Sequence, residues 1–178
     1  MLDKSLIRKK FSKLRKKNYF NVQDQFFNPI IQLTNKRFKQ KKILLSLYYP
    51  SNYEVNVLKI FNLIKKKNII TLLPSINKSR MEFLKWNNKD VLQVNKFGML
   101  EPISKNYFKN PNIMLIPLLS YDKYNNRIGY GKGYYDKFLS KCLKKNKEIL
   151  TIGVAFSFQK YHKLPTTKYD VKLNFILT

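Results

Sequence analysis

The sequence predicts a three-layer α/β sandwich, in which a mostly parallel central sheet is flanked by helices. Short apolar runs without polar alternation recur at 43–48, 69–73, 113–118 and 149–156, as expected of strands that are buried on both faces. Segments of helical length separate these runs, and this order of elements is typical of a parallel sheet. The 178 residues suit one core, so we expect a single domain over 1–178.

The first third of the chain is expected to contain helices on either side of one strand. Residues 3–18 place apolar side chains at helical spacing between basic ones. Residues 21–40 are expected to continue as helix with a break near Pro29. The run 43–48 is expected to be a buried strand. Residues 54–66 show the apolar period of an α-helix, which predicts another helix.

The middle of the chain is expected to add strands and a turn. Residues 69–73 form an apolar run that predicts a second buried strand. Residues 81–86 alternate between apolar and polar side chains, as in a strand with one exposed side. Residues 91–102 contain a candidate turn at Phe97-Gly98.

The last third is expected to return to strands, with one helix between them. Residues 113–118 predict a buried strand, and the polar, Gly-rich residues 121–133 predict a loop after it. Residues 134–145 carry apolar side chains at helical spacing. Residues 149–156 predict a buried strand, and the alternating residues 171–177 predict an edge strand.

The chain is strongly basic, with 36 Lys and Arg against 10 Asp and Glu and a formal net charge of +26. Such a charge favours nucleic-acid binding. Only five of these residues are arginine, although arginine makes the bidentate and stacking contacts by which nucleic acids are read. Lys, Asn, Ile, Phe and Tyr have AT-rich codons and are abundant here. Codon bias therefore explains the charge, and we do not expect a nucleic-acid partner.

Cysteine content and hydropathy indicate a reducing compartment. The single cysteine, Cys142, excludes a disulfide within the chain and argues against a cysteine-based metal site. Residues 1–17 are basic and lack an apolar segment of signal-peptide length. No apolar run approaches the roughly 18 residues of a membrane span. We expect a cytoplasmic monomer that does not bind membranes.

A Gly-rich segment follows the strand predicted at 113–118. Gly129, Gly131 and Gly133 alternate with other residues directly after Arg127. In an open α/β sheet, ligands bind beyond the carboxyl ends of the strands. Glycines there allow backbone N–H groups to approach phosphate oxygens, and Arg127 and Lys132 add positive charge. The glycine spacing is neither the dinucleotide fingerprint nor the Walker loop, so by itself it leaves phosphate binding undecided.

The full string NRIGYGKGYYD is far more specific than its glycines. It resembles the signature of the 5-formyltetrahydrofolate cyclo-ligase family, also called methenyltetrahydrofolate synthetases. That signature is a proline, an aromatic-Asp pair, a turn, and then Arg-Leu-Gly-x-Gly-x-Gly-Tyr-Tyr-Asp, in which this chain has Ile128 in place of Leu. The matching residues are Pro117, Tyr121, Asp122, Asn125, Asn126, Arg127, Gly129, Gly131, Gly133, Tyr134, Tyr135 and Asp136.

Other segments resemble the same family in their order and spacing, so the resemblance covers nearly the full chain. They comprise a Lys-x-x-x-Arg near the N-terminus, a Tyr-x-Pro with a following Glu, an apolar strand segment, a Phe-Gly-x-x-Glu-Pro, and a closing Leu-Pro with a later Asp. The residues are Lys4, Arg8, Tyr48, Pro50, Glu54, Pro74, Met81, Glu82, Phe83, Trp86, Phe97, Gly98, Glu101, Pro102, Leu164, Pro165 and Asp170.

The resemblance implies an enzyme that converts 5-formyltetrahydrofolate to 5,10-methenyltetrahydrofolate, with ATP as co-substrate and ADP and phosphate as products. Phosphorylation would make the formyl oxygen a good leaving group, and the anilino nitrogen would then close the ring. The implied ATP-binding residues are Lys4, Ser5, Leu6, Ile7, Arg8, Arg127, Ile128, Gly129, Tyr130, Gly131, Lys132, Gly133, Tyr134 and Tyr135. The implied substrate-binding residues are Arg8, Leu47, Glu54, Tyr130, Gly131, Lys132, Gly133 and Tyr134.

The resemblance also implies Mg²⁺ as cofactor, held by Asp136 and Asp170, because a carboxylate beside phosphates commonly binds this ion. The family often has a second acid four residues after the position of Asp170. This chain has Asn174 there, which predicts a weaker affinity for the metal.

Alternatives stay open at this level. Asp136 could be an acid favoured in a first helical turn, and Glu54 an acid at a helix start. Lys4 and Arg8 could be ordinary solvated charges, and His162 is not expected to be catalytic. For the whole chain, the alternatives are a nucleic-acid-binding protein and an ATP-binding relative with a different acyl substrate.

Overall fold

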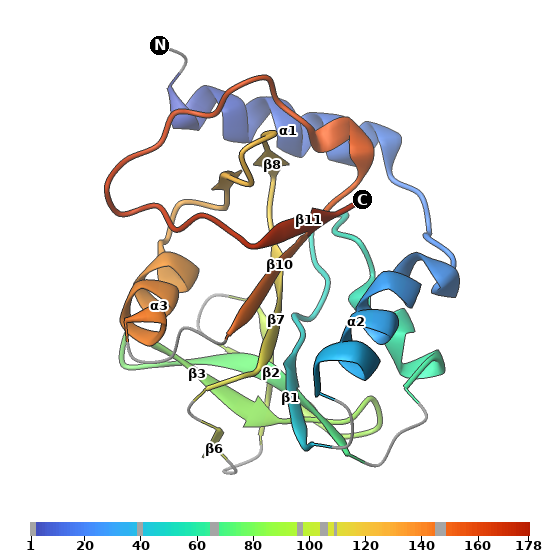
Figure 1. Ribbon diagram of the computed structural model, residues 1–178. Coiled ribbons are helices and arrows are strands. Elements are labelled where there is room, and N and C mark those ends of the chain that lie inside the picture. The colour runs from blue at the N-terminus through green and yellow to red at the C-terminus, as the bar shows by residue number, and fades with distance from the viewer. Residues whose placement is uncertain are drawn as a thin grey trace.

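The computed structural model describes residues 3–38, 41–64, 68–95, 98–103, 107–108, 110–144 and 149–178 (Figure 1). The helices of these residues are α1 (Lys4–Asn18), η1 (Asp24–Phe27), α2 (Asn28–Phe38), η2 (Val57–Asn62), α3 (Tyr134–Leu143) and η3 (Ser157–Gln159), where η marks a 3₁₀-helix. The strands are β1 (Ile43–Ser46), β2 (Ile69–Asn77), β3 (Arg80–Lys85), β4 (Leu92–Val94), β5 (Leu100–Pro102), β6 (Tyr107–Phe108), β7 (Ile113–Pro117), β8 (Ser120–Tyr121), β9 (Arg127–Ile128), β10 (Leu150–Val154) and β11 (Phe175–Leu177).

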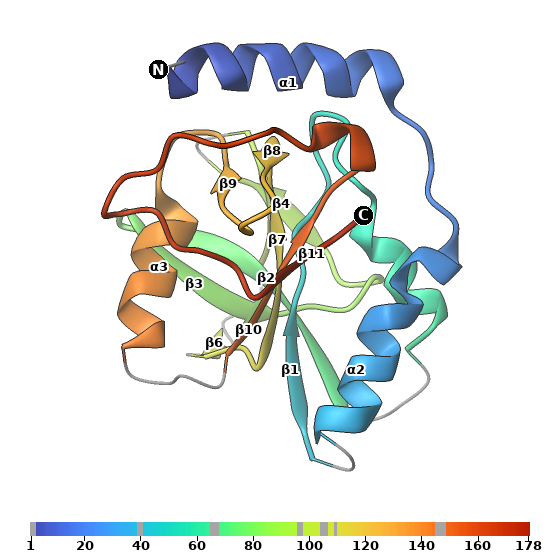
Figure 2. The ribbon, with the colours of Figure 1, turned by 45° about the horizontal axis from the view of Figure 1, so that its top comes forward.

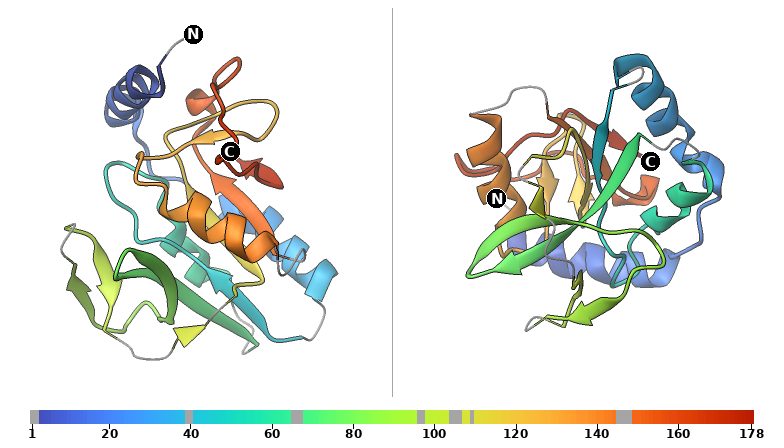
Figure 3. Two further views of the ribbon diagram at one scale, coloured as in Figure 1. Left: turned by 90° about the vertical axis from the view of Figure 1, so that its left-hand side faces the viewer. Right: turned by 90° about the horizontal axis from the view of Figure 1, so that it is seen from below.

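The central sheet has the order β11-β10-β7-β1-β2-β3-β6. Its strands from β11 to β2 are mutually parallel, whereas β3 and β6 are antiparallel additions at one edge. Helices α2 and α3 lie on opposite faces of this sheet (Figure 3). The expected fold class, with a mostly parallel sheet between helices, is therefore confirmed.

Two apolar clusters fill the space on either side of the sheet. Along β7, Ile113 and Leu115 join the cluster that also contains residues of α2, whereas Met114 and Ile116 join the cluster that contains residues of α3. All four side chains are fully buried. The strand reads as one apolar run because successive side chains point to opposite faces and both faces are covered.

Helix α1 is not part of either layer. It crosses the carboxyl ends of the parallel strands, above the small β8–β9 hairpin (Figure 2). Asp3 caps the helix, because its side chain accepts a hydrogen bond from the backbone N–H of Ser5. Ile7 and Phe11 are buried in a separate cluster with Ile128. This packing places the N-terminal turn of α1 over the Gly-rich segment.

The β2–β3 hairpin extends beyond the rest of the sheet. The predicted strand 69–73 continues to Asn77, and Pro74 pairs with Phe83. The last pair between β2 and β1 is Leu72 with Ser46. A proline is tolerated at position 74 because no ladder partner lies on the β1 side there.

Two predicted helices differ in the structure. Residues 54–66 were expected to be one helix, but the described part forms only the short η2, which begins after the Asn56 cap. The preceding residues form a turn in which the Ser51 N–H donates to the carboxylate of Glu54 at 2.8 Å. Of the predicted helical region 21–40, the described residues form η1 and then α2, which ends at Phe38. The first turn of α2 contains Pro29, where a missing N–H costs no hydrogen bond.

The remaining predicted elements are found with small changes. The predicted edge strand 171–177 is confirmed only at its end, because β11 comprises Phe175–Leu177 and pairs with β10. The predicted loop 121–133 contains the strand β9. Gly98, with φ of 73°, lies in the turn of the β4–β5 hairpin, whereas Phe97 lies outside the described residues. Among the described helices, none is long and apolar enough to cross a bilayer.

Substituting Gly153 in β10 should destabilise the fold. A Cβ at this position would lie 2.6 Å from Cδ1 of Ile176 and 2.7 Å from Cδ2 of Leu118. We expect Gly153→Ala to lower the free energy of unfolding by about 1–3 kcal/mol, because overpacking displaces buried neighbours. Chemical denaturation measures this change. Gly129→Ala is the control, since its nearest neighbour is 4.0 Å away. Equal stability of both variants would contradict the packing of β10 described above.

Candidate active site

A cavity of about 1120 Å³ lies at the carboxyl end of the sheet. Segments that are distant in sequence meet around it: α1, the loop after β1, the extended β2–β3 hairpin, the β4–β5 hairpin, the Gly-rich segment with α3, and the segment before β11. The lining residues used below are Lys4, Arg8, Tyr48, Ser51, Glu54, Ile76, Met81, Met99, Arg127, Gly129, Tyr130, Gly131, Lys132, Gly133, Tyr134, Tyr135, Asp136 and Asp170.

The Gly-rich segment 127–136 is closed by its own end residues. The Nη2 atom of Arg127 donates to Oδ1 of Asp136 at 2.9 Å, and its Nη1 donates to Oδ2 at 3.4 Å. Gly131 and Gly133 have φ of 96° and 68°, values that favour glycine. The Nε atom of Arg127 is buried without an acceptor among the described residues. The segment is thus a tight loop with one buried donor available.

Asp122 organises the turn that leads into this loop. Its carboxylate accepts hydrogen bonds from the backbone N–H groups of Tyr124, Asn126 and Leu164. Burial alone would raise the pKa of Asp122, but these hydrogen bonds and the one from the Asn126 amide hold the pKa below its usual value. The acid of the aromatic-Asp pair is therefore a structural residue here, and it fixes the start of β9.

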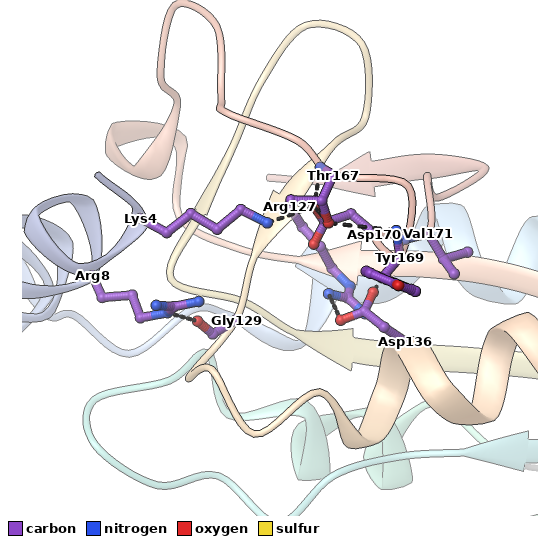
Figure 4. A network of polar contacts seen from close by, with 9 residues as sticks. All are labelled: Lys4, Arg8, Arg127, Gly129, Asp136, Thr167, Tyr169, Asp170 and Val171. Atoms are coloured by element: carbon purple, nitrogen blue, oxygen red, sulfur yellow. Dashed lines mark hydrogen bonds and ion pairs between the residues drawn. The ribbon is translucent and has the colours of Figure 1, made fainter. Parts of the chain in front are cut away.

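Two cations of helix α1 point into the site: Arg8 toward the Gly-rich segment and Lys4 toward Asp170 (Figure 4). The Nε atom of Arg8 donates to the Gly129 carbonyl at 2.9 Å, and a Cβ at Gly131 would lie 3.2 Å from Cζ of Arg8. Lys4 forms an ion pair with Asp170 at 2.5 Å. The glycine at position 131 therefore makes room for the guanidinium of Arg8.

Asp170 and Asp136 are linked through neighbouring backbone. Asp170 also accepts hydrogen bonds from the N–H and hydroxyl of Thr167, at 2.6 Å and 2.9 Å. The N–H of Val171, the next residue, donates to Oδ1 of Asp136 at 3.1 Å. Burial raises the pKa of Asp170, but the hydrogen bonds from Lys4 and Thr167 outweigh it and hold the pKa below its ordinary value.

The cavity is also lined by a buried carboxylate, Glu54, which is 6% exposed and comes from the loop after β1. The hydroxyl of Tyr130 donates to Oε1 of Glu54 at 2.7 Å, and Ser51 N–H donates to Oε2. Arg15, which is 1% exposed, donates from Nη2 to the same Tyr130 hydroxyl and from Nη1 to the Leu118 carbonyl at 3.2 Å. Burial raises the pKa of Glu54, although Tyr130, Ser51 and Arg15 act against it.

Tyrosines surround this carboxylate and stay protonated at neutral pH. Burial, followed by the charge of Glu54, raises the pKa of Tyr48, Tyr130 and Tyr135 well above the ordinary tyrosine value. These hydroxyls therefore act as donors: Tyr130 donates to Glu54, and Tyr48 donates to the Val55 carbonyl at 2.9 Å.

The structure brings most of the predicted site residues to the cavity. Glu54 reaches the cavity from a turn that precedes η2. It is therefore not the helix-start acid of the alternative interpretation. Ser5, Leu6, Ile7 and Leu47 are not among the residues that line the cavity. Leu6 is largely exposed, whereas the side chains of Ile7 and Leu47 are buried in apolar clusters. Their roles in binding ATP or substrate stay predictions.

Sequence reasoning missed Arg15. A signal was present, because Arg15 continues the buried stripe of Ile7 and Phe11 at a spacing of four residues along α1. A charge in register with an apolar helix face requires a partner inside the protein. Its partner Tyr130 is 115 residues away in sequence, so the pairing itself was not visible.

Asp136 and Asp170 are the two acids predicted from sequence to hold Mg²⁺, and both line the cavity. Within the described ranges, no group of three or more acidic, His or Cys side chains is placed to hold a metal ion. Mg²⁺ is commonly held by one or two carboxylates together with substrate phosphates and water. Asp136 and Asp170 can supply such carboxylates at one end of the cavity, in exchange for their contacts with Arg127 and Lys4.

Comparison with known proteins identifies relatives over the whole described fold. A model of the 5-formyltetrahydrofolate cyclo-ligase family matches residues 2–178. A 5-formyltetrahydrofolate cyclo-ligase of Mycoplasma genitalium is 36% identical over 138 residues, which are 75% of this chain and 70% of the relative. One of Haemophilus influenzae is 29% identical over 140 residues, 75% of this chain and 74% of the relative.

Two solved structures that resemble this fold are also methenyltetrahydrofolate synthetases. The 5,10-methenyltetrahydrofolate synthetase of Mycoplasma pneumoniae superposes with a TM-score of 0.70 at 27% identity, over 99% of this chain and 98% of the other. The structure of 5,10-methenyltetrahydrofolate synthetase from Aquifex aeolicus has a TM-score of 0.71 at 25% identity, over 98% and 88% of the two chains.

The ion pair between Lys4 and Asp170 should make stability depend on pH. A carboxyl whose pKa is lowered by folding stabilises the protein above its unfolded pKa, and this stabilisation is lost as the pH falls through the folded pKa. We expect Lys4→Met to lower the free energy of unfolding by less than about 1 kcal/mol above roughly pH 5, because the pair is partly exposed. The difference should shrink as the pH falls below the usual Asp pKa of 3.8 and should vanish only below the lower pKa of Asp170 in the folded protein.

Denaturation curves of wild type and Lys4→Met between pH 3 and 7 measure this difference. Lys9→Met on the exposed side of α1 is the control, and it should show no such trend. A Lys4→Met effect that is constant across this pH range would mean that the pair does not act through the Asp170 charge.

Proposed function

This chain belongs to the 5-formyltetrahydrofolate cyclo-ligase family, and we propose that it converts 5-formyltetrahydrofolate and ATP to 5,10-methenyltetrahydrofolate, ADP and phosphate. The observation that carries the proposal is that one cavity joins two different walls. One wall is the Gly-rich loop with the cations of α1, which suits a polyphosphate. The other is the buried Glu54 with its tyrosines, which suits the polar edge of a pterin.

The proposed reaction solves the problem of a poor electrophile in two steps. The formyl oxygen attacks the γ-phosphorus of ATP, the bond from that phosphorus to the bridging oxygen breaks, and ADP leaves. The anilino nitrogen then attacks the activated formyl carbon and loses its proton. The bond from that carbon to the phosphorylated oxygen breaks, and phosphate leaves with the former formyl oxygen.

The phosphate side of the cavity supplies positive charge and orientation, which phosphoryl transfer needs more than covalent help. Arg8 and Lys4 come from α1, and Arg127 and Lys132 come from the loop. The free Nε–H of Arg127 can donate to a phosphate oxygen, since it has no acceptor among the described residues. When phosphate replaces Asp170 as the partner of Lys4, the carboxylate is released beside Asp136.

Mg²⁺, when held by Asp136 and Asp170, would supply charge neutralisation to the phosphates. The carboxylates themselves hold the loop and the segment before β11 in place, through Arg127, Val171 and Thr167. The Oδ1 atom of Asn174 accepts hydrogen bonds from the N–H and hydroxyl of Thr151, and Asn174 does not line the cavity. That the cavity offers Asp136 and Asp170 without a third acid at this position supports a modest affinity for the ion.

The pterin side of the cavity orients the reacting atoms. Glu54 can accept from the N–H groups of the pterin, and the apolar side chains of Ile76, Met81 and Met99 can cover its ring. Tyr134 of the Gly-rich loop lines the cavity, and its hydroxyl would donate to the formyl oxygen. Orientation of this kind contributes to catalysis by bringing the formyl oxygen into line with the phosphate.

Wider features of the proposal rest on sequence and composition. We propose that 1–178 acts as one domain and as a cytoplasmic monomer. The cytoplasmic location is supported by the single cysteine, Cys142, because a chain with one cysteine forms no internal disulfide, as is usual in a reducing compartment. The proposal excludes nucleic acid as a partner. The alternatives predict other outcomes: a nucleic-acid-binding protein forms no methenyl product, and an ATP-binding relative turns over ATP only with another acyl substrate.

Turnover can be followed by the absorbance of methenyltetrahydrofolate with ATP, Mg²⁺ and 5-formyltetrahydrofolate. We expect product with wild type, and losses of kcat/KM of about 10²–10³-fold in Lys132→Ala and Asp136→Ala, the size expected for removing transition-state charge stabilisation. His162→Ala should match wild type, because His162 is exposed and lies outside the cavity lining. No product from folded wild type would contradict the function, and full activity of both cavity variants would contradict the site.

Removing Mg²⁺ with a chelator should abolish turnover, and adding the ion back should restore it. We expect Asp136→Asn and Asp170→Asn to raise the Mg²⁺ concentration for half-maximal activity by at least roughly tenfold. The matched variant Asp24→Asn changes a carboxylate that accepts from Asn62, so its Mg²⁺ requirement should stay that of wild type. Identical Mg²⁺ titrations for all three variants would exclude the two acids as ligands.

A further inference from the structure

Arg15 is the buried cation that the proposed reaction does not use directly. It is 1% exposed, and a buried charge is costly unless polar groups compensate it. Neither of the two ion pairs among the described residues includes it. Its hydrogen bonds go to the Leu118 carbonyl and the Tyr130 hydroxyl, and its guanidinium lies 5.5 Å from the centre of the Tyr130 ring.

The same Tyr130 hydroxyl continues the chain of contacts to Glu54. Because its oxygen accepts the hydrogen bond from Arg15, its one proton is directed to Oε1 of Glu54, at 2.7 Å. Tyr130 is 44% exposed and lines the cavity, so this connection sits at the ligand surface. The positive charge of Arg15 also favours the ionised form of Glu54, against its burial.

We propose that Arg15 is a positioning residue that acts through Tyr130 to keep Glu54 ionised and aimed at a ligand edge with two adjacent N–H donors. The inference rests on the proposed function and names how its pterin wall is assembled. A carboxylate has about four acceptor sites. Tyr130 occupies one site on Oε1, and the Ser51 N–H occupies one on Oε2.

The geometry leaves about one acceptor site on each oxygen of Glu54, apart from a long contact of 3.4 Å from the Ser51 hydroxyl. That arrangement matches the ring N–H and exocyclic amino group on one edge of a pterin, which a carboxylate accepts as a pair. Without Arg15, the Tyr130 hydroxyl can rotate its proton elsewhere. Glu54 would then lose both a fixed donor and the nearby positive charge.

The test separates the pterin wall from the phosphate wall by measuring KM for each substrate. Arg15→Met should raise KM for 5-formyltetrahydrofolate roughly ten- to a hundredfold, with KM for ATP changed less than about threefold. Tyr130→Phe keeps the ring and removes the hydroxyl, and it should raise the same KM in the same direction. Lys16→Met, on the exposed side of α1, is the matched control and should behave as wild type.

The pH profile provides a readout that a purely structural role would not move. The ionisable side chains that couple to Glu54 are Arg15, Tyr48, Tyr130 and Tyr135. Loss of the Arg15 charge should move the acid limb of kcat/KM for 5-formyltetrahydrofolate to higher pH by about one unit. An unmoved acid limb together with an unchanged folate KM would overturn the proposal.

A double-mutant cycle with Glu54→Gln completes the test. If Arg15 acts through the Glu54 charge, Arg15→Met should change the folate KM by less than about threefold in the Glu54→Gln background. Equal effects of Arg15→Met in both backgrounds would overturn the proposal. If Arg15→Met does not fold, the cycle is measured with Tyr130→Phe and Glu54→Gln instead, and equal effects of Tyr130→Phe on the folate KM in both backgrounds would overturn the proposal.

The outcomes also separate this inference from the function on which it rests. A wild-type protein that forms no methenyl product contradicts the function, and the inference is then rejected with it. A wild-type protein that forms product, with Arg15→Met and Tyr130→Phe indistinguishable from Lys16→Met, contradicts the inference alone.

Discussion

The ion pair between Arg127 and Asp136 closes the Gly-rich loop at its two ends, and the rest of the site depends on that closure. Asp136 also receives the N–H of Val171, so the segment before β11 is attached to the same carboxylate. Its neighbour Asp170 holds Lys4, which brings in α1. Three regions that are far apart in sequence are thus joined through two acids. In a chain with only 10 acidic residues and 36 basic ones, these acids are scarce, and both are placed at the cavity.

The charged groups of the two walls differ in their exposure and in the groups that compensate their charge. On the side that we propose binds phosphate, Lys4 and Arg127 form ion pairs with partly exposed carboxylates, which a polyanion could replace. On the side that we propose binds the pterin, Glu54 is buried, and hydrogen bonds from the neutral groups of Tyr130 and Ser51 and the charge of Arg15 act against the effect of burial on its pKa. The extended β2–β3 hairpin adds apolar side chains to this second wall. This extension forms because β2 continues to Asn77, beyond the end of its neighbour β1 at Ser46.

Much of this arrangement could be predicted from sequence, because it depends on local pattern. Apolar runs indicated the buried strands, and the loop 127–136 carried its own signature. The short η2 in place of a helix could not be predicted, since apolar periodicity at 54–66 does not reveal the Ser51–Glu54 turn that precedes it. The continuation of β2 through Pro74 depends on where β1 ends. Arg15 was missed because its partners, Leu118 and Tyr130, are more than 100 residues away.

The position of α1 across the top of the sheet has a consequence for how the molecule assembles during synthesis. The ribosome synthesises α1 before its polar partners Gly129, Tyr130 and Asp170, which follow 115 to 166 residues later. Contacts of such sequence separation are slow to form, because a long intervening chain must first be ordered. Helix α1 cannot make its contact with Asp170 until the strands β1 to β10 have all been synthesised. The cavity of the nascent protein is complete only when α1 and the segment before β11 meet.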